Sequence, residues 1–484
     1  MPVRGGDLTP RHPSARPTLA PMPSHRLARV LFAVLLVASC GGGGRTSPPG
    51  GAPGTRPGPT AEGGAPRAQQ GISFDATPLF RQMGMLARGL PFPLVGRAAF
   101  AATPSPDSTH VVVAVAFANA TLAFAREADN RFRANYTVAV TLSRDAVAVA
   151  SSQASEQLLV GTYRETTRTD ESVIHQEILD VSPGRYTLTV AVRDEGSQRT
   201  AQEQIAIVVP RLGEGSLSSP MPIAEVTPRS SRDSVPLVLL NPAAIAVAGR
   251  DSVLPVYLEG YGDTTAAVRL LIRSERGRVM WNDTVRVAAR GAMRAGVVEV
   301  PVSRIGIGVA QLTFVRDGGA DSSSAYVFVG FGGDLPVATY DEMVNYLRWF
   351  AQPYRLQKLR DATEETRPAA WAEFVRETDD RPETPMHEGL RDYFGRLIRA
   401  NGRFREEATP GWMSDRGRVY VSLGEPDQII EPQVADFSRG RQQLWDYRAQ
   451  NMQLVFYDQT GTGRWRLTQA SEVRFESEFR RRLK

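Results

Sequence analysis

The chain has 484 residues, of which 42% are hydrophobic and 23% charged, values typical of globular protein and sufficient for about three domains. The formal net charge is +5, but arginine is interspersed with acidic residues, whereas nucleic-acid-binding elements concentrate basic residues, so we expect no nucleic acid partner. The single cysteine excludes a disulfide framework and a cysteine-based zinc site within one chain.

Residues 22–40, MPSHRLARVLFAVLLVASC, have the layout of a secretion signal. A positive segment precedes an apolar run at 30–37 that is too short to span a bilayer as a helix. Small residues precede Cys40, so this stretch resembles a bacterial lipoprotein signal, whose cysteine receives the lipid. An ordinary secretory signal is the alternative. Translation from either Met1 or Met22 is compatible with the sequence, and residues 1–40 are interpreted as upstream extension plus signal.

Residues 41–71 are dominated by glycine and proline and contain almost nothing apolar to bury. This composition predicts a disordered tether between a lipid anchor and the folded part of the chain. The residue after the cysteine is Gly41 rather than aspartate. By resemblance to other lipoproteins, this implies a lipid anchor in the outer membrane, facing the periplasm.

Two β-rich regions come next, at 72–212 and 220–333. Short segments rich in Val, Ile, Tyr and Thr are separated by turn residues, and several alternate with period two. We expect two tandem all-β sandwiches of immunoglobulin or fibronectin type. The predicted strands are 110–118, 134–142, 156–163, 172–181, 185–194 and 202–210 in the first region, and 235–240, 245–249, 253–260, 267–274, 278–287, 295–302, 308–317 and 324–331 in the second.

Residues 336–484 are expected to form an α+β domain, with helices followed by antiparallel strands. Thr339 and Glu342 form a capping box for a first helix, which Pro353 ends. A second helix carries Leu356 and Leu359, a third is capped by Thr363 and carries Trp371, and a fourth runs from Thr384-Pro385 to Asn401-Gly402, with Met386 in its apolar stripe. The remainder, 411–484, is predicted as short strands and turns, with a meander at 443–448, 452–458 and 463–469.

The stretch 411–430, GWMSDRGRVYVSLGEPDQII, contains most of the candidate site residues. Trp412 is large enough to anchor a turn at Pro410-Gly411, Asp415 can accept backbone hydrogen bonds, and Gly417 can take a positive φ. Val419, Val421 and Leu423 alternate with polar residues and favour a strand; a helix ended by Gly424 is the alternative. A second turn comes after it. The motif residues interpreted as structural are Gly411, Trp412, Ser414, Asp415, Gly417, Gly424, Pro426 and Asp427.

This stretch resembles the GWxTD domain family of bacterial envelope proteins, with serine at 414 in place of threonine. Further matching segments bring the resemblance to about 335–470, outside the two β regions. The resemblance implies an envelope setting and an α+β domain, and it supplies no catalytic residue. The matching segments are YLRWFAQPYRLQKLRDAT (346–363), WAEFVRETD (371–379), RANGRF (399–404), GRVYVSLGEPDQI (417–429), LWDYR (444–448) and LVFYDQTGTGRWRL (454–467).

Candidate reactive residues have structural interpretations. His110, His175 and His387 lack metal-ligand spacing, and there is no G-x-S-x-G elbow and no P-loop. The pairs Glu364-Glu365 and Asp379-Asp380 are interpreted as helix-end charges. Four tryptophans are expected in a domain core, with an aromatic groove for a peptide or glycan as the alternative: Trp371, Trp412, Trp445 and Trp465.

Three carboxylates, Asp415, Glu425 and Asp427, stand close in sequence beside Arg416 and Arg418. If they faced one cleft they could bind a cation or carbohydrate, or serve a glycosidase, which needs two carboxylates at a set separation. The interpretation we favour is turn chemistry, with no catalytic residue, metal or cofactor.

We therefore expect a non-enzymatic, lipid-anchored envelope protein that binds a protein or cell-wall partner through its sandwiches and its C-terminal domain. The alternatives are an envelope hydrolase that uses carboxylates of the 411–427 region, and an accessory lipoprotein for outer-membrane assembly. The last rests on a fold-level analogy with small lipoproteins of barrel assembly.

Overall fold

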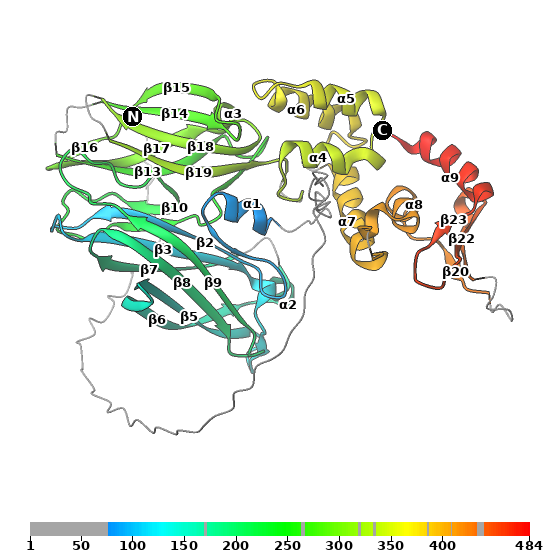
Figure 1. Cartoon of the computed structure of the whole chain (residues 1–484), viewed down its shortest axis with the longest axis horizontal. Helices are drawn as coiled ribbons and strands as arrows, with labels where there is room; N and C mark the ends of the chain where they lie inside the picture. The colour runs from blue at the N-terminus through cyan, green and yellow to red at the C-terminus, as the bar shows by residue number, and fades with distance from the viewer. Residues whose placement is uncertain are drawn as a thin grey trace, which may run out of the picture. The chain divides into compact units, whose positions relative to one another are not determined.

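The structure is a computed structural model and describes residues 76–168, 172–262, 267–317, 321–332, 335–384, 387–407, 409–432 and 440–484 (Figure 1). The predicted signal, the tether and the lipid-attachment residue Cys40 lie outside the described residues, as does Met386.

The first β region is a sandwich of two antiparallel sheets. One sheet has the order β1-β2-β3-β7; the other has the order β4-β5-β8-β9, and β6 also pairs with β5. Helix α1 (Thr77–Gln82), the 3-10 turn η1 (Asn119–Thr121) and helix α2 (Tyr163–Thr166) accompany them. The strands are β1 (Leu86–Arg88), β2 (Leu94–Ala102), β3 (Thr109–Ala118), β4 (Ala125–Arg126), β5 (Phe132–Arg144), β6 (Val147–Val160), β7 (Ser172–Val181), β8 (Gly184–Asp194) and β9 (Thr200–Val209).

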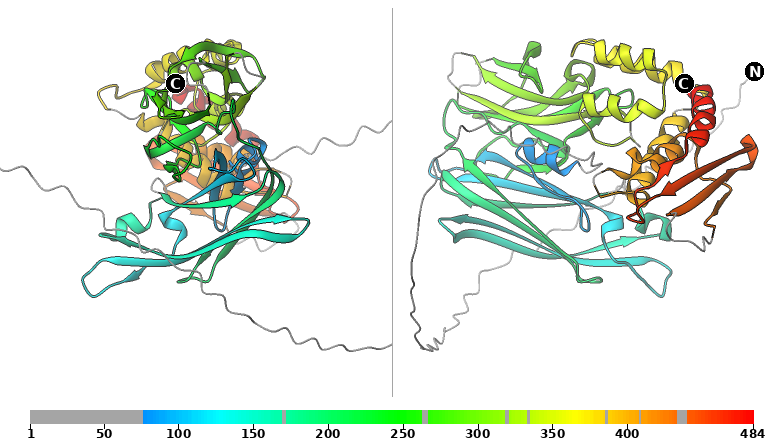
Figure 2. Two further views of the ribbon diagram at one scale, coloured as in Figure 1. Left: turned by 90° about the vertical axis from the view of Figure 1, so that its left-hand side faces the viewer. Right: turned by 45° about the vertical axis from the view of Figure 1, so that its right-hand side comes forward.

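The apolar run HVVVAVAFA belongs to strand β3, which is buried on both faces. Val111, Val113 and Val115 belong to the core between the two sheets of the first sandwich, whereas Val112 and Ala114 belong to a second cluster. That second cluster also contains Met221, Tyr257 and other residues of the second sandwich. The ribbons of the two sandwiches lie next to each other (Figure 2). A strand buried on both faces loses the period-two alternation of a half-exposed strand, as β3 does.

The second β region is also a sandwich, with sheet orders β11-β10-β13-β17-β16 and β12-β19-β18-β14-β15. All pairings are antiparallel except the parallel one between β12 and β19. Helix α3 (Val302–Ile305) comes after β17. The strands are β10 (Met221–Thr227), β11 (Leu237–Leu240), β12 (Ile245–Val247), β13 (Val253–Tyr261), β14 (Val268–Ser274), β15 (Val279–Val285), β16 (Ala289–Arg290), β17 (Met293–Pro301), β18 (Gly308–Arg316) and β19 (Ser322–Gly330).

A buried ion pair lies where the sandwiches meet. Arg229 donates to both carboxylate oxygens of Glu259 over 2.8 Å, and Tyr257 and Tyr261 each donate to one of these oxygens over 2.7 Å. Arg229 also donates to the carbonyl of Ala102 in the first sandwich. Both charged side chains are at most 3% exposed. Four donated hydrogen bonds satisfy the carboxylate, which is what a buried charge requires.

The C-terminal region begins with helices. The capping box of Thr339 and Glu342 is confirmed. Two predicted helix starts are wrong: α6 is preceded by Thr366 rather than Thr363, and α7 begins after His387 rather than at Thr384-Pro385 and continues through Asn401-Gly402. The elements are α4 (Tyr340–Tyr346), η2 (Leu347–Trp349), α5 (Pro353–Asp361), α6 (Arg367–Thr378), α7 (Glu388–Arg403), η3 (Gly411–Met413) and α8 (Asp415–Leu423).

A small antiparallel sheet with the order β20-β21-β22-β23 completes the region and includes the predicted meander. The final helix, α9 (Gln469–Arg482), lies where the sequence predicted strands and turns, so that prediction is wrong. Only Phe475 and Phe479 of its large apolar residues are buried, so its apolar stripe is short. The other elements are β20 (Gln428–Ile430), β21 (Arg441–Tyr447), η5 (Arg448–Gln450), β22 (Met452–Asp458) and β23 (Arg466–Leu467). The predicted fold class, two sandwiches followed by an α+β region, is confirmed.

Candidate functional site

Residues 415–423 form helix α8, and the predicted strand is wrong. The side chain of Ser414 caps the helix by accepting a hydrogen bond from the amide of Gly417 over 3.1 Å. Gly424, at φ +93°, ends it. Val419, Tyr420 and Val421 are all buried, which a strand exposed on one face would not allow. The alternation in sequence is therefore incidental, and the alternative of a helix ended by Gly424 is correct.

Gly411 and Gly417 are required because a side chain would not fit, and not because their backbone has a positive φ. Gly417 does not have the predicted positive φ. A Cβ atom on Gly417 would lie 1.8 Å from the carbonyl oxygen of Gly411. A Cβ atom on Gly411 would in turn lie 2.3 Å from the carbonyl oxygen of Ala400, at the end of α7. The turn 410–414 is thus held directly between the backbones of α7 and α8.

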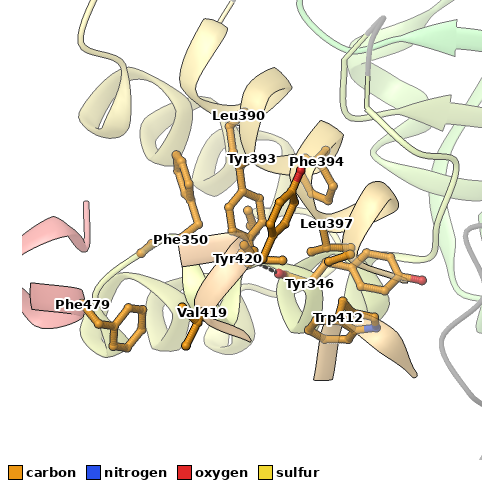
Figure 3. Packing of buried hydrophobic residues seen from close by; sticks show 14 of the residues in the cluster. Tyr346, Phe350, Leu390, Tyr393, Phe394, Leu397, Trp412, Val419, Tyr420 and Phe479 are labelled. Carbon is orange, nitrogen blue, oxygen red and sulfur yellow. Dashed lines mark hydrogen bonds between the residues drawn. The ribbon is translucent and has the colours of Figure 1, made fainter. Parts of the chain in front are cut away.

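Trp412 fills the core beneath this turn (Figure 3). Its side chain is fully buried, and its ring meets the ring of Tyr346 edge-on with 6.1 Å between centroids. The guanidinium of Arg348 lies 5.2 Å from the same ring centroid. Trp371, Trp445 and Trp465 are also buried in this core. These tryptophans act mainly as packing residues of the core.

Asp415 joins α8 to β23. Its carboxylate accepts a hydrogen bond from the amide of Leu467 over 2.8 Å and lies 3.6 Å from the guanidinium of Arg466. The amide is 52 positions away in sequence, so the contact is tertiary rather than the local turn predicted. Glu406, which is buried, accepts from the amide of Trp465 beside it. Both carboxylates fix the strand that follows the 459–463 turn.

The other two candidate acids have separate environments. Glu425 is exposed and pairs with Arg403 on α7 over 2.7 Å. Asp427 accepts from the amide of Arg448 over 2.7 Å, and the neighbouring Pro426 is buried. Asp415, Glu425 and Asp427 therefore contact three different elements and do not meet around one hollow. A two-carboxylate site at these positions is not formed.

Arg416 and Arg418 flank Asp415 and point to different partners. Arg418 pairs with Glu472 and Glu476 of α9. Arg416 lies against the rings of Phe404 and Trp465, at 5.4 and 4.8 Å from their centroids. Burial lowers the pKa of Arg416 to about 10, so it remains protonated at neutral pH. Its charge is held by the aromatic faces and by nearby carboxylates.

A hollow of about 700 Å³ lies beside α6. No sequence pattern predicted it, because its walls come from segments that are far apart along the chain. Trp371, Val375 and Phe331 provide apolar wall, and Arg376 and Asp379 are among its charged residues. Val302 and Ser303 of the second sandwich also line the hollow. This is a mostly apolar concavity with a few charges, as partner-binding hollows are.

The three histidines are engaged in the fold. Nδ1 of His110 lies 2.5 Å from Oδ1 of Asp180, and Nε2 of His175 lies 3.1 Å from Oε1 of Glu177. His387 accepts from the amide of Leu390 through Nδ1 and so caps α7; burial lowers its pKa below the ordinary value. Asp379 follows α6, as the helix-end interpretation requires. Within the described residues, no group of three or more His, Cys, Asp or Glu side chains could hold a metal ion.

Residues 314–474 match the family model of the GWxTD domain. The C-terminal part of this chain is a GWxTD domain. Among curated proteins, no sequence matches the chain. The match begins inside β18, so the GWxTD domain as the family defines it includes the last strand of the second sandwich, β19. The carbonyl of Phe331, just past β19, accepts a hydrogen bond from the indole of Trp371 in α6 over 3.1 Å.

Solved structures show only distant likeness to the chain. A biofilm-associated protein BSP domain aligns at 10% identity and a TM-score of 0.15, over 49% of this chain and 51% of that one. Trypsin-activated alpha-2-macroglobulin from Escherichia coli aligns at 11% identity and a TM-score of 0.17, over 49% of this chain and 16% of that one. The chain thus spans about half, or less, of these proteins. Scores this low establish no shared fold.

Proposed function

We propose that this protein is a non-enzymatic, lipid-anchored binding protein of the bacterial cell envelope, and that its GWxTD domain contributes to holding a protein partner in the hollow beside α6. The observation that carries the proposal is that the motif residues have structural roles. Gly411, Trp412, Ser414, Asp415 and Gly417 all serve backbone packing or capping, which leaves the motif as scaffold.

The hollow supplies the open binding surface that the motif residues do not form. Its apolar wall is formed by Phe331, Trp371 and Val375, and Asp251, Arg376 and Asp379 are the charged residues that line it. Apolar surface stabilises a bound partner by about 25 cal/mol per Å² removed from water, while charged residues of both signs add orientation. A protein segment with apolar side chains fits this chemistry. The lipid anchor at Cys40, expected from the sequence, would keep the hollow at the membrane surface.

Lipid attachment and partner binding can be tested separately. Mass spectrometry of the membrane-bound chain should show acylation at Cys40, and Cys40→Ser should move the chain to the soluble fraction. For the hollow, a photo-crosslinking amino acid replaces Ala372, which is exposed and lines it, and a control replaces Val473, which is exposed on α9 and does not.

We expect one discrete adduct from position 372 in intact cells and none from 473, and we expect Val375→Asp to reduce it more than tenfold. Adducts equal at both positions, or none at either, would exclude the hollow as the binding site. An adduct with an outer-membrane barrel protein would instead assign the assembly-accessory alternative. An unmodified Cys40 in the mature chain would remove the anchor from the proposal without affecting the hollow.

A further inference from the structure

Strand β6 is a long edge strand whose outer backbone edge is open. It has 14 residues and pairs only with β5. Edge strands of monomeric proteins are commonly blocked by proline, lysine or inward charges. The sequence of β6, VAVASSQASEQLLV, contains no proline, glycine, lysine or arginine. Its protective features are a single charged residue, Glu156, on the inward face and a bulge near its start. Within the described residues, no backbone hydrogen bond reaches its free edge.

Two other edge strands of the same sandwich receive hydrogen bonds from neighbouring elements. On β9, the backbone carbonyl of Gln202 accepts a hydrogen bond from Arg88 of β1. On β7, the side chain of Gln176 bonds the carbonyl of Val238 and the amide of Leu240, both on β11. On β6, by contrast, the apolar residues Val147, Val149 and Leu159 are exposed.

The two faces of β6 can be assigned by its register. Ala150 and Leu158 pack against the sandwich core, so even-numbered residues from 150 onward face inward. Ser151, Gln153, Ser155 and Gln157 are exposed on the outer face. A bulge lies between Ala148 and Ala150, so the regular part of the strand is 150–160.

We propose that β6 pairs antiparallel with β6 of a second copy of this chain, about a two-fold axis at Ala154. The strand is self-complementary in this register. Apolar residues face apolar ones (Ala150 opposite Leu158), and polar residues face polar ones. In the centre, Gln153 lies opposite Ser155, Ser151 opposite Gln157, and Ser152 opposite Glu156.

An axis that passes through a residue, rather than between two residues, also matches the faces. Residues directly opposite in an antiparallel pair share a face, and their numbers here sum to an even value, so inner meets inner and outer meets outer. The two sheets then continue as one, and each copy gains about one backbone hydrogen bond per paired residue. A shift by one residue would place outer polar residues against inner apolar ones.

One local charge opposes the pairing. Glu156 of one copy would lie opposite Ser152 of the other, whose hydroxyl bonds Glu177 over 2.9 Å. Two carboxylates are thus brought near each other, although His175 also contacts Glu177. Like charges across a strand pair destabilise it modestly. We therefore expect Glu156→Gln to strengthen association several-fold.

The primary test uses the full chain purified in detergent and the variant Ala154→Cys. Residues at the axis have Cβ atoms within reach of a disulfide, so mild oxidation should produce a covalent dimer. The controls are the wild-type chain, which has only Cys40, and Ala139→Cys on β5, the neighbour of β6 within the sheet. Both should give at least tenfold less dimer.

A charge swap then tests the register. In the Ala154→Cys background, Gln153→Lys/Ser155→Lys places lysine opposite lysine twice and should abolish the dimer, and Gln153→Glu/Ser155→Glu should do the same. A mixture of the two should restore a mixed dimer. Lysines at Gln202 and Gln204 on β9 are the matched control and should have no effect, since these exposed residues lie on the strand at the opposite side of the same sheet.

Two results would overturn the proposal: no disulfide dimer above the controls, or a dimer that survives both charge variants. A covalent adduct of Ala154→Cys with a different protein would also overturn it, since the edge would then accept a foreign strand. Circular dichroism that matches the wild type establishes that each variant is folded.

Discussion

Gly417, in the first turn of α8, lies directly against the carbonyl oxygen of Gly411: a Cβ atom at position 417 would be 1.8 Å from that oxygen. The atoms that would clash belong to backbone, so no rotamer change relieves the overlap. The turn and the helix are therefore held in contact by the absence of a side chain.

We expect Gly417→Ala to destabilise the GWxTD domain by about 3 kcal/mol or more, because overpacking against backbone forces the chain apart. Gly402→Ala is the matched control. It also lies in a helix, and a Cβ there meets nothing within 4 Å, so it should be neutral or stabilise by up to about 1 kcal/mol. Urea unfolding monitored by tryptophan fluorescence measures both; equal effects would contradict the packing role.

Removal of the carboxylates Asp415 and Glu425 should reduce stability by different amounts, because their contacts differ. Asp415→Ala leaves the amide of Leu467 without its acceptor and should cost about 1–3 kcal/mol. Glu425→Ala removes an exposed ion pair with Arg403 and should cost at most about 0.5 kcal/mol. Chemical unfolding of the two variants tests this order. A larger loss for Glu425→Ala than for Asp415→Ala would contradict the roles assigned to the two carboxylates.

The ion pair of Arg229 and Glu259 predicts strong coupling. Glu259→Gln leaves a buried guanidinium without its counter-charge and should cost about 3–5 kcal/mol, as should Arg229→Met. The double variant should lose clearly less than the sum, because neither charge is then unpaired. Arg269→Met, which breaks an exposed pair with Asp317, is the control and should have little effect. Additive losses in calorimetry would argue against the pairing.

His387 predicts a pH dependence. Burial lowers its pKa in the folded chain below the ordinary value of 6.5, and Nδ1 must be neutral to accept from Leu390. The unfolded chain therefore binds more protons as pH falls through 6.5, so this contribution to stability is present above that pH and lost below it. His387→Asn keeps a cap without the titration. The urea midpoint of the wild type should fall more between pH 7.5 and 5.5 than that of the variant.

Much of the fold could be predicted from the sequence because the signals are local. The capping box at Thr339, the alternation in 185–194 and the apolar strands of both sandwiches depend on residues a few positions apart. Residues 418–423 show the limit of such signals: period two and a short buried helix both place Val419 and Val421 inside. The cap at Ser414 and the stop at Gly424 decide for the helix.

The candidate site was less predictable because its contacts join distant segments. Asp415 contacts Leu467, and Trp371 contacts Phe331, which no spacing rule links. The free edge of β6 depends on which strand becomes its neighbour. Composition alone shows that β6 has a single charged residue, but only the strand order shows that it is an edge.

The hydrogen bond from Trp371 to Phe331 has a consequence for how such proteins diversify. Recombination that replaces the second sandwich up to residue 336 would replace Phe331, whose carbonyl accepts from that indole and whose ring packs on it with 4.8 Å between centroids. Recombination that yields a folded protein should therefore break upstream of β18. The last two strands of the second sandwich, β18 and β19, would then be inherited together with the helices that follow them.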